Sequence, residues 1–123
     1  MKIQESAENY LETILVLGKR LGNVRSIDIA NELGFSKPSV SYAMKQFREN
    51  GLVYVDDNGY IKLTEEGKAV AERTYERHEV LSRFFVALGV DEETASEDAC
   101  RIEHVISQKT FEQIREHAKT LTE

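Results

Sequence analysis

Apolar residues recur at helical intervals in the first part of the chain and predict two amphipathic helices. Residues 6–20 place apolar side chains every three or four positions, with Ser6 as a candidate N-cap. Residues 26–33 repeat this pattern over a shorter length, and we expect Ser26 to cap that helix and Gly34 to end it. The chain therefore begins with a helix and a short helix, each with one apolar face.

A third helix follows after a tight turn and leads into a hairpin. Ser36 is its candidate N-cap, and residues 50–51, an Asn-Gly pair, are its expected end. Residues 52–63 hold two β-rich runs around a second Asn-Gly pair at 58–59, which is a strong turn signal. Helix, short helix, tight turn, helix and hairpin is the order of a winged helix-turn-helix.

The helical pattern returns after the hairpin and continues to the end of the sequence. It predicts a long helix over 64–89, a further helix over 91–106 and a last one over 107–121. We therefore expect a mainly α protein with a small β-hairpin: an N-terminal winged helix-turn-helix and a C-terminal helical domain. A chain of 123 residues has a small core, so we also expect the helical part to complete its core by forming a homodimer.

The charge of the chain limits the kinds of partner that it can bind. A net charge of -6 argues against a general binder of polyanions, so any DNA binding must be local. No apolar run approaches the roughly 18 residues of a membrane span, and the N-terminus lacks the pattern of a signal peptide. A single cysteine fits a reducing compartment. We expect a cytoplasmic protein with no membrane partner.

The third predicted helix begins with small polar residues that can approach a DNA groove. Lys45 and Arg48, with the N-terminal amides, are expected to bind phosphates, and Tyr42 and the small residues to meet base edges. Tyr42 has an alternative position, packed on Tyr10 or on the wing. The predicted DNA-binding residues are Ser36, Lys37, Pro38, Ser39, Ser41, Tyr42, Lys45 and Arg48. The wing turn at 56–59 carries two acids and no base, so we interpret it as a structural edge.

The segment ACRIEHVIS near the C-terminus brings three potential metal ligands onto one helical face. Cys100, Glu103 and His104 supply sulfur, oxygen and nitrogen, and acidic residues are frequent just before them. The same pattern fits one buried thiol beside two surface groups. From spacing alone, a metal site and this simpler arrangement both remain open.

Four segments together resemble the metal-dependent repressor family of the diphtheria toxin repressor and the manganese transport regulator. They are SAENYLETI, SKPSVSYAMKQF followed by ENGLV, ERHEVLSRF, and EDACRIEHVIS. The resemblance implies a homodimeric repressor of metal homeostasis genes that divalent metal activates on double-stranded operator DNA, and not an enzyme. It implies DNA binding by residues 1–63, and metal binding and dimerisation by residues 64–123. It also implies the short form of the family, without an SH3-like domain.

The resemblance also implies a ligand set, which mixes two types of family member. Asn9 stands where iron-type members have methionine and manganese-type members aspartate, whereas Glu12 matches a carboxylate of the manganese type. Cys100 matches the iron type. Two positions of the second metal site of iron-type members are Ser82 and Ser96, which puts that site in doubt, although Glu79 or Glu97 could substitute. The implied ligands are Asn9, Glu12, His78, Cys100, Glu103 and His104.

Sulfur and imidazole ligands favour Fe(II), Co(II), Ni(II) or Zn(II), while the carboxylates keep Mn(II) possible. We expect Fe(II) as the cofactor, with Zn(II), Co(II) or Ni(II) able to substitute in vitro. One rival interpretation is a metal hydrolase with Glu103 as base, but so short a helical chain shows no substrate pocket, and we expect no small-molecule substrate. Another is a winged-helix regulator or protein-interaction module that does not sense metal.

Overall fold

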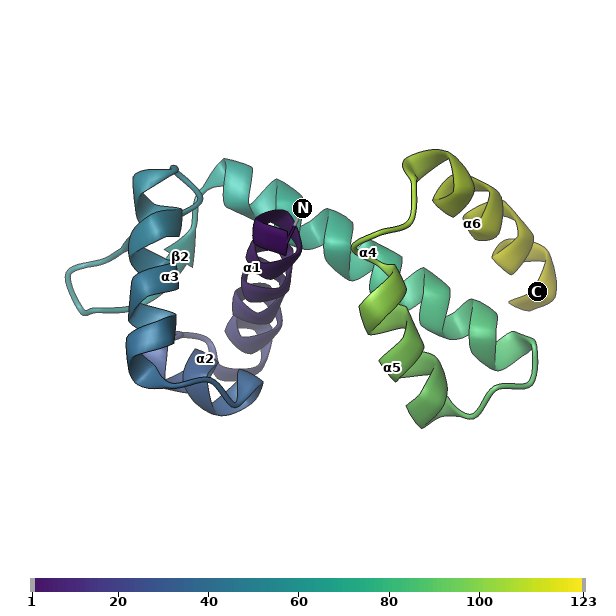
Figure 1. Cartoon of the computed structure of the whole chain (residues 1–123), viewed down its shortest axis with the longest axis horizontal. Coiled ribbons are helices and arrows are strands. Elements are labelled where there is room, and N and C mark those ends of the chain that lie inside the picture. Colours follow the sequence, from purple (N-terminus) through teal and green to yellow (C-terminus); the bar gives the residue numbers. More distant parts are fainter. Residues whose placement is uncertain (1, 123) are drawn as a thin grey trace. The chain divides into compact units, whose positions relative to one another are not determined.

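Figure 1 shows the computed structural model, which describes the backbone of residues 2–122 and the side chains of residues 6–120. The described chain forms two compact units, Met1–Glu72 and Arg73–Glu123, and the division falls within one long helix. The elements are α1 (Lys2–Leu21), α2 (Ser26–Leu33), α3 (Lys37–Glu49), β1 (Val53–Val55), β2 (Ile61–Leu63), α4 (Glu65–Ala87), α5 (Glu92–Ile102) and α6 (Gln108–Thr122). The expected order of helices and hairpin is confirmed. No helix in the described part is long and apolar enough to cross a membrane.

The first unit packs α1, α2, α3 and the hairpin around one apolar core. Leu11, Ile29 and Val40 are fully buried, one from each helix. The ring of Tyr10 meets those of Phe35 and Phe47 edge-on, with centroids 5.8 and 5.5 Å apart. Each large apolar side chain buried in this way contributes about 1.5–3 kcal/mol. The helix-turn-helix is thus fixed on α1 by packing.

The helix starts show two errors in the sequence prediction and one success. Helix α1 begins before Ser6, which lies inside the helix and is not its cap. The N-cap of α2 is Arg25 rather than Ser26, because the Arg25 amide donates to the Asp28 carboxylate at 2.9 Å. For α3 the prediction is confirmed, since the Ser36 hydroxyl accepts from the amide three residues later at 3.3 Å.

One of the two acidic residues in the wing, Asp56, stabilises the hairpin turn. One oxygen of the Asp56 carboxylate accepts from the amides of Asn58 and Tyr60, both at 2.9 Å. Gly59 adopts a φ of 82°, which favours glycine. At the start of α4, Gly67 packs against the backbone of Leu52, and a Cβ there would lie 2.0 Å from the carbonyl oxygen. Hydrogen bonds to Asp56 therefore stabilise the tip of the hairpin, and close packing at Gly67 holds its base against α4.

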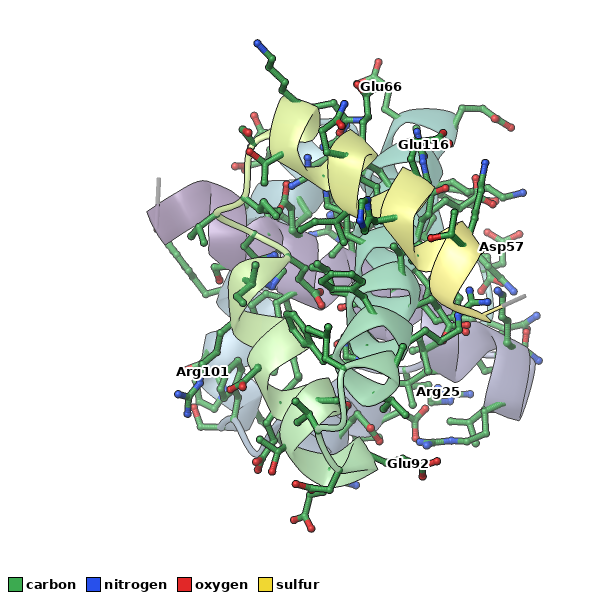
Figure 2. The ribbon with its side chains drawn as sticks, turned by 90° about the vertical axis from the view of Figure 1, so that its right-hand side faces the viewer. Arg25, Asp57, Glu66, Glu92, Arg101 and Glu116 are labelled. Atoms are coloured by element: carbon green, nitrogen blue, oxygen red, sulfur yellow. The ribbon has the colours of Figure 1, made fainter. Side chains whose placement is uncertain are left out.

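The second unit packs the C-terminal part of α4 with α5 and α6 around Leu81, Ala99 and Phe111. Figure 2 shows the charged side chains of Arg101 and Glu116 extending outward from α5 and α6. The helix predicted over 91–106 is too long, because α5 ends at Ile102 and a turn follows it. This turn, residues 103–107, contains two of the predicted metal ligands.

Candidate metal centre

The centre of the candidate site is a buried carboxylate at the C-terminus of α5. Glu103 is the C-cap of α5, its side chain is 0% exposed, and its Oε1 atom lies 2.8 Å from Nδ1 of His78 on α4. Its Oε2 atom is buried and accepts no hydrogen bond from any residue that the structure describes. His104 lies near that oxygen, with Nε2 at 3.7 Å. A buried carboxylate oxygen without a donor is costly, so it is an available ligand for a cation.

A thiol completes a group of three possible ligand atoms. Cys100 lies on α5, one turn before Glu103, and is an exposed residue. One ligand atom each from His78, Cys100 and Glu103 lies within 4.8 Å of the others. Imidazole nitrogen, thiolate sulfur and carboxylate oxygen are the donors that iron, cobalt and zinc sites use. The residues present therefore fit a divalent transition metal.

The structure brings together part of the predicted ligand set. His78, Cys100 and Glu103 form the cluster, and His104 adjoins it through Glu103. The other two predicted ligands, Asn9 and Glu12, lie on α1 in the first unit, where Glu12 is buried and Asn9 half-buried. Their assignment as ligands therefore stays a proposal that rests on the resemblance.

The positions of the doubtful second site lie beside the first. The hydroxyl of Ser96 is 3.4 Å from Nε2 of His78, so each ring nitrogen of this histidine has a polar neighbour. The Ser82 hydroxyl is buried and, among the described residues, has no hydrogen-bond partner. Both serines line one open cavity with His78 and Glu79. Neutral hydroxyls thus stand where the resemblance implies ligands of a second cation, and Glu79 places a carboxylate at the same cavity.

Arg77 is a residue of this region that sequence reasoning missed. Its guanidinium donates to the main-chain carbonyls of Glu103 and Ile106 and to the side chain of Gln108. The available signal was its position directly before His78 in the segment ERH. No periodicity reveals it, because its targets are backbone atoms far along the chain.

All eight residues of the predicted DNA-binding surface are exposed on α3 or at its N-cap. Tyr42 is 67% exposed, and the Tyr10 ring contacts Phe35 and Phe47 instead. Tyr42 is therefore free of the alternative packing on Tyr10 and open to solvent. These side chains form one polar surface that begins at a helix N-terminus, which is where anions bind.

Two basic residues at the base of the wing were also missed. The Arg25 guanidinium carbon lies 4.6 Å from the centroid of the Tyr60 ring, and Lys62 Nζ lies 5.9 Å from it. Lys62 also donates to the Asn23 side chain at 3.0 Å. The wing turn lacks a base, but the fold places two cations beside it. Contacts between distant segments of this kind are not visible in the sequence.

Comparison with known families covers both units. A family model for the iron dependent repressor, N-terminal DNA binding domain, matches residues 2–61, and one for its metal binding and dimerisation domain matches residues 64–123. The transcriptional regulator MntR of Escherichia coli O6:H1 is 34% identical over 112 residues, which cover 91% of this chain and 72% of the relative. The chain belongs to the iron-dependent repressor family. This confirms the resemblance, and the family is one of transcriptional regulators rather than enzymes.

Solved structures of similar proteins agree with the fold. The manganese regulator SloR has a TM-score of 0.81 and 26% identity, covering 92% of this chain and 53% of its own. A manganese-dependent transcriptional repressor in complex with manganese has a TM-score of 0.83 and 27% identity, covering 92% of this chain and 52% of its own. The chain thus spans about half the length of these two solved chains. A winged helix-turn-helix followed by a helical domain is confirmed.

Proposed function

We propose that this protein is a transcriptional repressor that divalent metal activates for binding, as a homodimer, to double-stranded operator DNA of metal homeostasis genes. The observation that carries the proposal is the cluster of His78, Cys100 and Glu103, in which the buried Glu103 carboxylate keeps one oxygen without a hydrogen bond among the described residues. The family match, with its DNA-binding half and its metal-binding and dimerisation half, supports the rest. Cytoplasmic localisation follows from this function.

The proposed ligands come from two distant parts of the sequence. Cys100, Glu103 and His104 lie at the end of α5 and in the turn after it, with His78 on α4. Asn9 and Glu12 on α1 are added on the strength of the resemblance alone. When bound, the metal would supply positive charge beside the buried carboxylate of Glu103. A ligand that binds the DNA-competent state more tightly than the other state shifts the population toward it.

The donors favour Fe(II) as the physiological metal. A thiolate and two imidazoles bind Fe(II) better than Mn(II), whereas Glu12, Glu103 and Asn9 keep hard oxygen ligands available. The two named solved structures are a manganese regulator and a manganese-dependent repressor, and in this chain Mn(II) is the second candidate. Cys100, the single cysteine, is the residue that places Fe(II) before Mn(II) in this preference.

The proposed DNA contacts divide into two groups. Lys45, Arg48 and the first amides of α3 bind phosphates, while Tyr42 and the serines approach base edges. Because the whole chain is acidic, with a net charge of -6, affinity depends on this local surface and on its correct placement in the dimer. Metal that favours the correct placement of this surface therefore raises the affinity for DNA.

Anaerobic selection from a random duplex library with Fe(II) present, followed by fluorescence anisotropy on the selected duplex, tests the proposal. We expect the Kd for DNA to fall at least tenfold when Fe(II) replaces chelator. An equal Kd with chelator and with Fe(II) would contradict it and favour a winged-helix regulator that does not sense metal.

A further inference from the structure

Arg77 joins three parts of the second unit through one guanidinium group. Its Nη1 atom donates to the carbonyl oxygen of Glu103 at 3.0 Å and to that of Ile106 at 2.8 Å. Its Nη2 atom donates to the side chain of Gln108 at 2.9 Å. The contacts therefore connect α4 to the end of α5, to the turn and to the start of α6.

These bonds satisfy carbonyl groups that a helix leaves unpaired. The last carbonyls of an α-helix have no intrahelical donor. The carbonyls of Glu103, at the end of α5, and of Ile106, in the turn after it, accept from Arg77 instead. A planar guanidinium presents several N–H groups in a fixed fork, and it stays charged at every relevant pH. The turn is therefore held by a group whose charge does not change with pH.

The guanidinium of Arg77 is itself held in place. Its central carbon lies 5.3 Å from the centroid of the Phe111 ring, and that of Arg115 lies 5.4 Å from the same ring. Phe111 is 1% exposed, so its position is set by the core. Arg115 is in turn paired with Glu76 at 3.2 Å. This cation–π contact adds to the hydrogen bonds that hold the Arg77 side chain.

Two consecutive residues of α4 bind the main chain and the side chain of Glu103. Arg77 binds its main-chain carbonyl, and His78 contacts its side-chain carboxylate at 2.8 Å. Because the backbone of Glu103 and one oxygen of its carboxylate are both held, the direction of the unpartnered Oε2 atom is restricted. Nε2 of His104, the next residue, lies 3.7 Å from that atom.

We infer that Arg77 is a positioning residue of the metal centre, which fixes the turn after α5 so that Glu103 and His104 present their donors beside Cys100 and His78. This inference rests on the proposed metal-binding function. Arg77 does not touch the ion. It acts through the carbonyl groups of the turn, and residues that orient metal ligands typically change metal affinity by about 10- to 100-fold.

The test uses Co(II) as the probe, added anaerobically to the reduced full chain, with affinity from calorimetry and geometry from the visible absorption spectrum. In Arg77→Lys the charge and most of the stem remain, but the fork that binds several acceptors at once is lost. We expect about a tenfold weaker Kd for Co(II) and altered d–d bands. Arg101→Lys is the matched control, because Arg101 adjoins Cys100 in sequence but extends outward from α5 (Figure 2).

A second variant keeps the test decisive if Arg77→Lys fails to fold. Gln108→Ala removes one acceptor of Arg77 and leaves the arginine in place, and we expect a smaller loss of Co(II) affinity in the same direction. Wild-type affinity and an unchanged spectrum in the folded variants would overturn the role of Arg77 while leaving the proposed function intact. Absence of Co(II) binding by the wild type would overturn both.

Discussion

Nδ1 of His78 lies 2.8 Å from Oε1 of Glu103, so that the imidazole covers a carboxylate with no exposed surface. The contact joins α4 to the C-terminus of α5. It keeps two proposed ligands together and offsets part of the cost of burying the carboxylate. The fold itself therefore places these two side chains side by side.

This contact leads to a prediction about the metal-free protein. His78→Ala leaves the Glu103 carboxylate buried without its closest partner, so the free energy of unfolding should fall by about 2 kcal/mol. Adding Glu103→Gln removes the buried charge and should recover part of that loss. Urea denaturation of the two single variants and the double variant, with chelator present, measures the coupling. Additive effects would show that the contact contributes no stability.

Cys100 should control the choice of metal. Cys100→Glu replaces a soft thiolate with a hard carboxylate, so we expect affinity for Mn(II) to rise relative to Fe(II). Cys100→Ala should weaken binding of both ions and leave the dimer intact. Competition titrations under anaerobic conditions give the ratio of affinities, and light scattering gives the oligomeric state. An unchanged Mn(II)-to-Fe(II) ratio in Cys100→Glu would show that the sulfur is not a ligand.

The N-cap of α5 predicts a difference in acid stability. The amide and hydroxyl groups of Thr94 hydrogen-bond the Asp91 carboxylate and hold its pKa below the ordinary value of 3.8. The ionised cap therefore stabilises the fold above that value, and its contribution is lost as the pH falls through the lowered pKa. Asp91→Asn keeps a capping side chain that does not titrate. Its stability should decline less steeply than that of the wild type below about pH 4, measured by urea denaturation, and parallel profiles would contradict this assignment.

The DNA surface can be tested by its dependence on salt. Lys45→Ala and Arg48→Ala should each weaken binding to the selected duplex and reduce the slope of log K against log salt by about one. Lys109→Ala is the control, because this exposed lysine lies on α6, outside the predicted surface. A slope that is unchanged in both α3 variants would place the phosphate contacts elsewhere.

The local signals in the sequence predicted much of the fold because they act over a few residues. Ser36 as a cap, Gly34 at the end of α2 and the turn at Gly59 depend on nearby backbone groups, and the structure has them as expected. At the start of α2, Asp28 competes with Ser26 and moves the cap to Arg25. The spacing of apolar residues does not predict which of these residues becomes the N-cap.

The candidate site was predictable only in part, for a similar reason. The spacing of Cys100 and Glu103 places both on one helical face, which periodicity can show. The pairing of Glu103 with His78 and Arg77 spans α4 and α5, separated by 25 and 26 residues in sequence. The same arginine contacts the carbonyls beyond Ile102, where the predicted helix was too long. Tertiary contacts of this kind leave no periodic pattern in the sequence.

Reciprocity between metal and DNA provides the most direct test of metal activation. If Fe(II) tightens DNA binding by some factor, the selected duplex must tighten Fe(II) binding by the same factor. Anaerobic measurement of the Fe(II) Kd with and without saturating duplex should show a decrease of at least about tenfold, which corresponds to roughly 1.4 kcal/mol of coupling. An Fe(II) Kd that is the same with and without DNA would contradict metal activation.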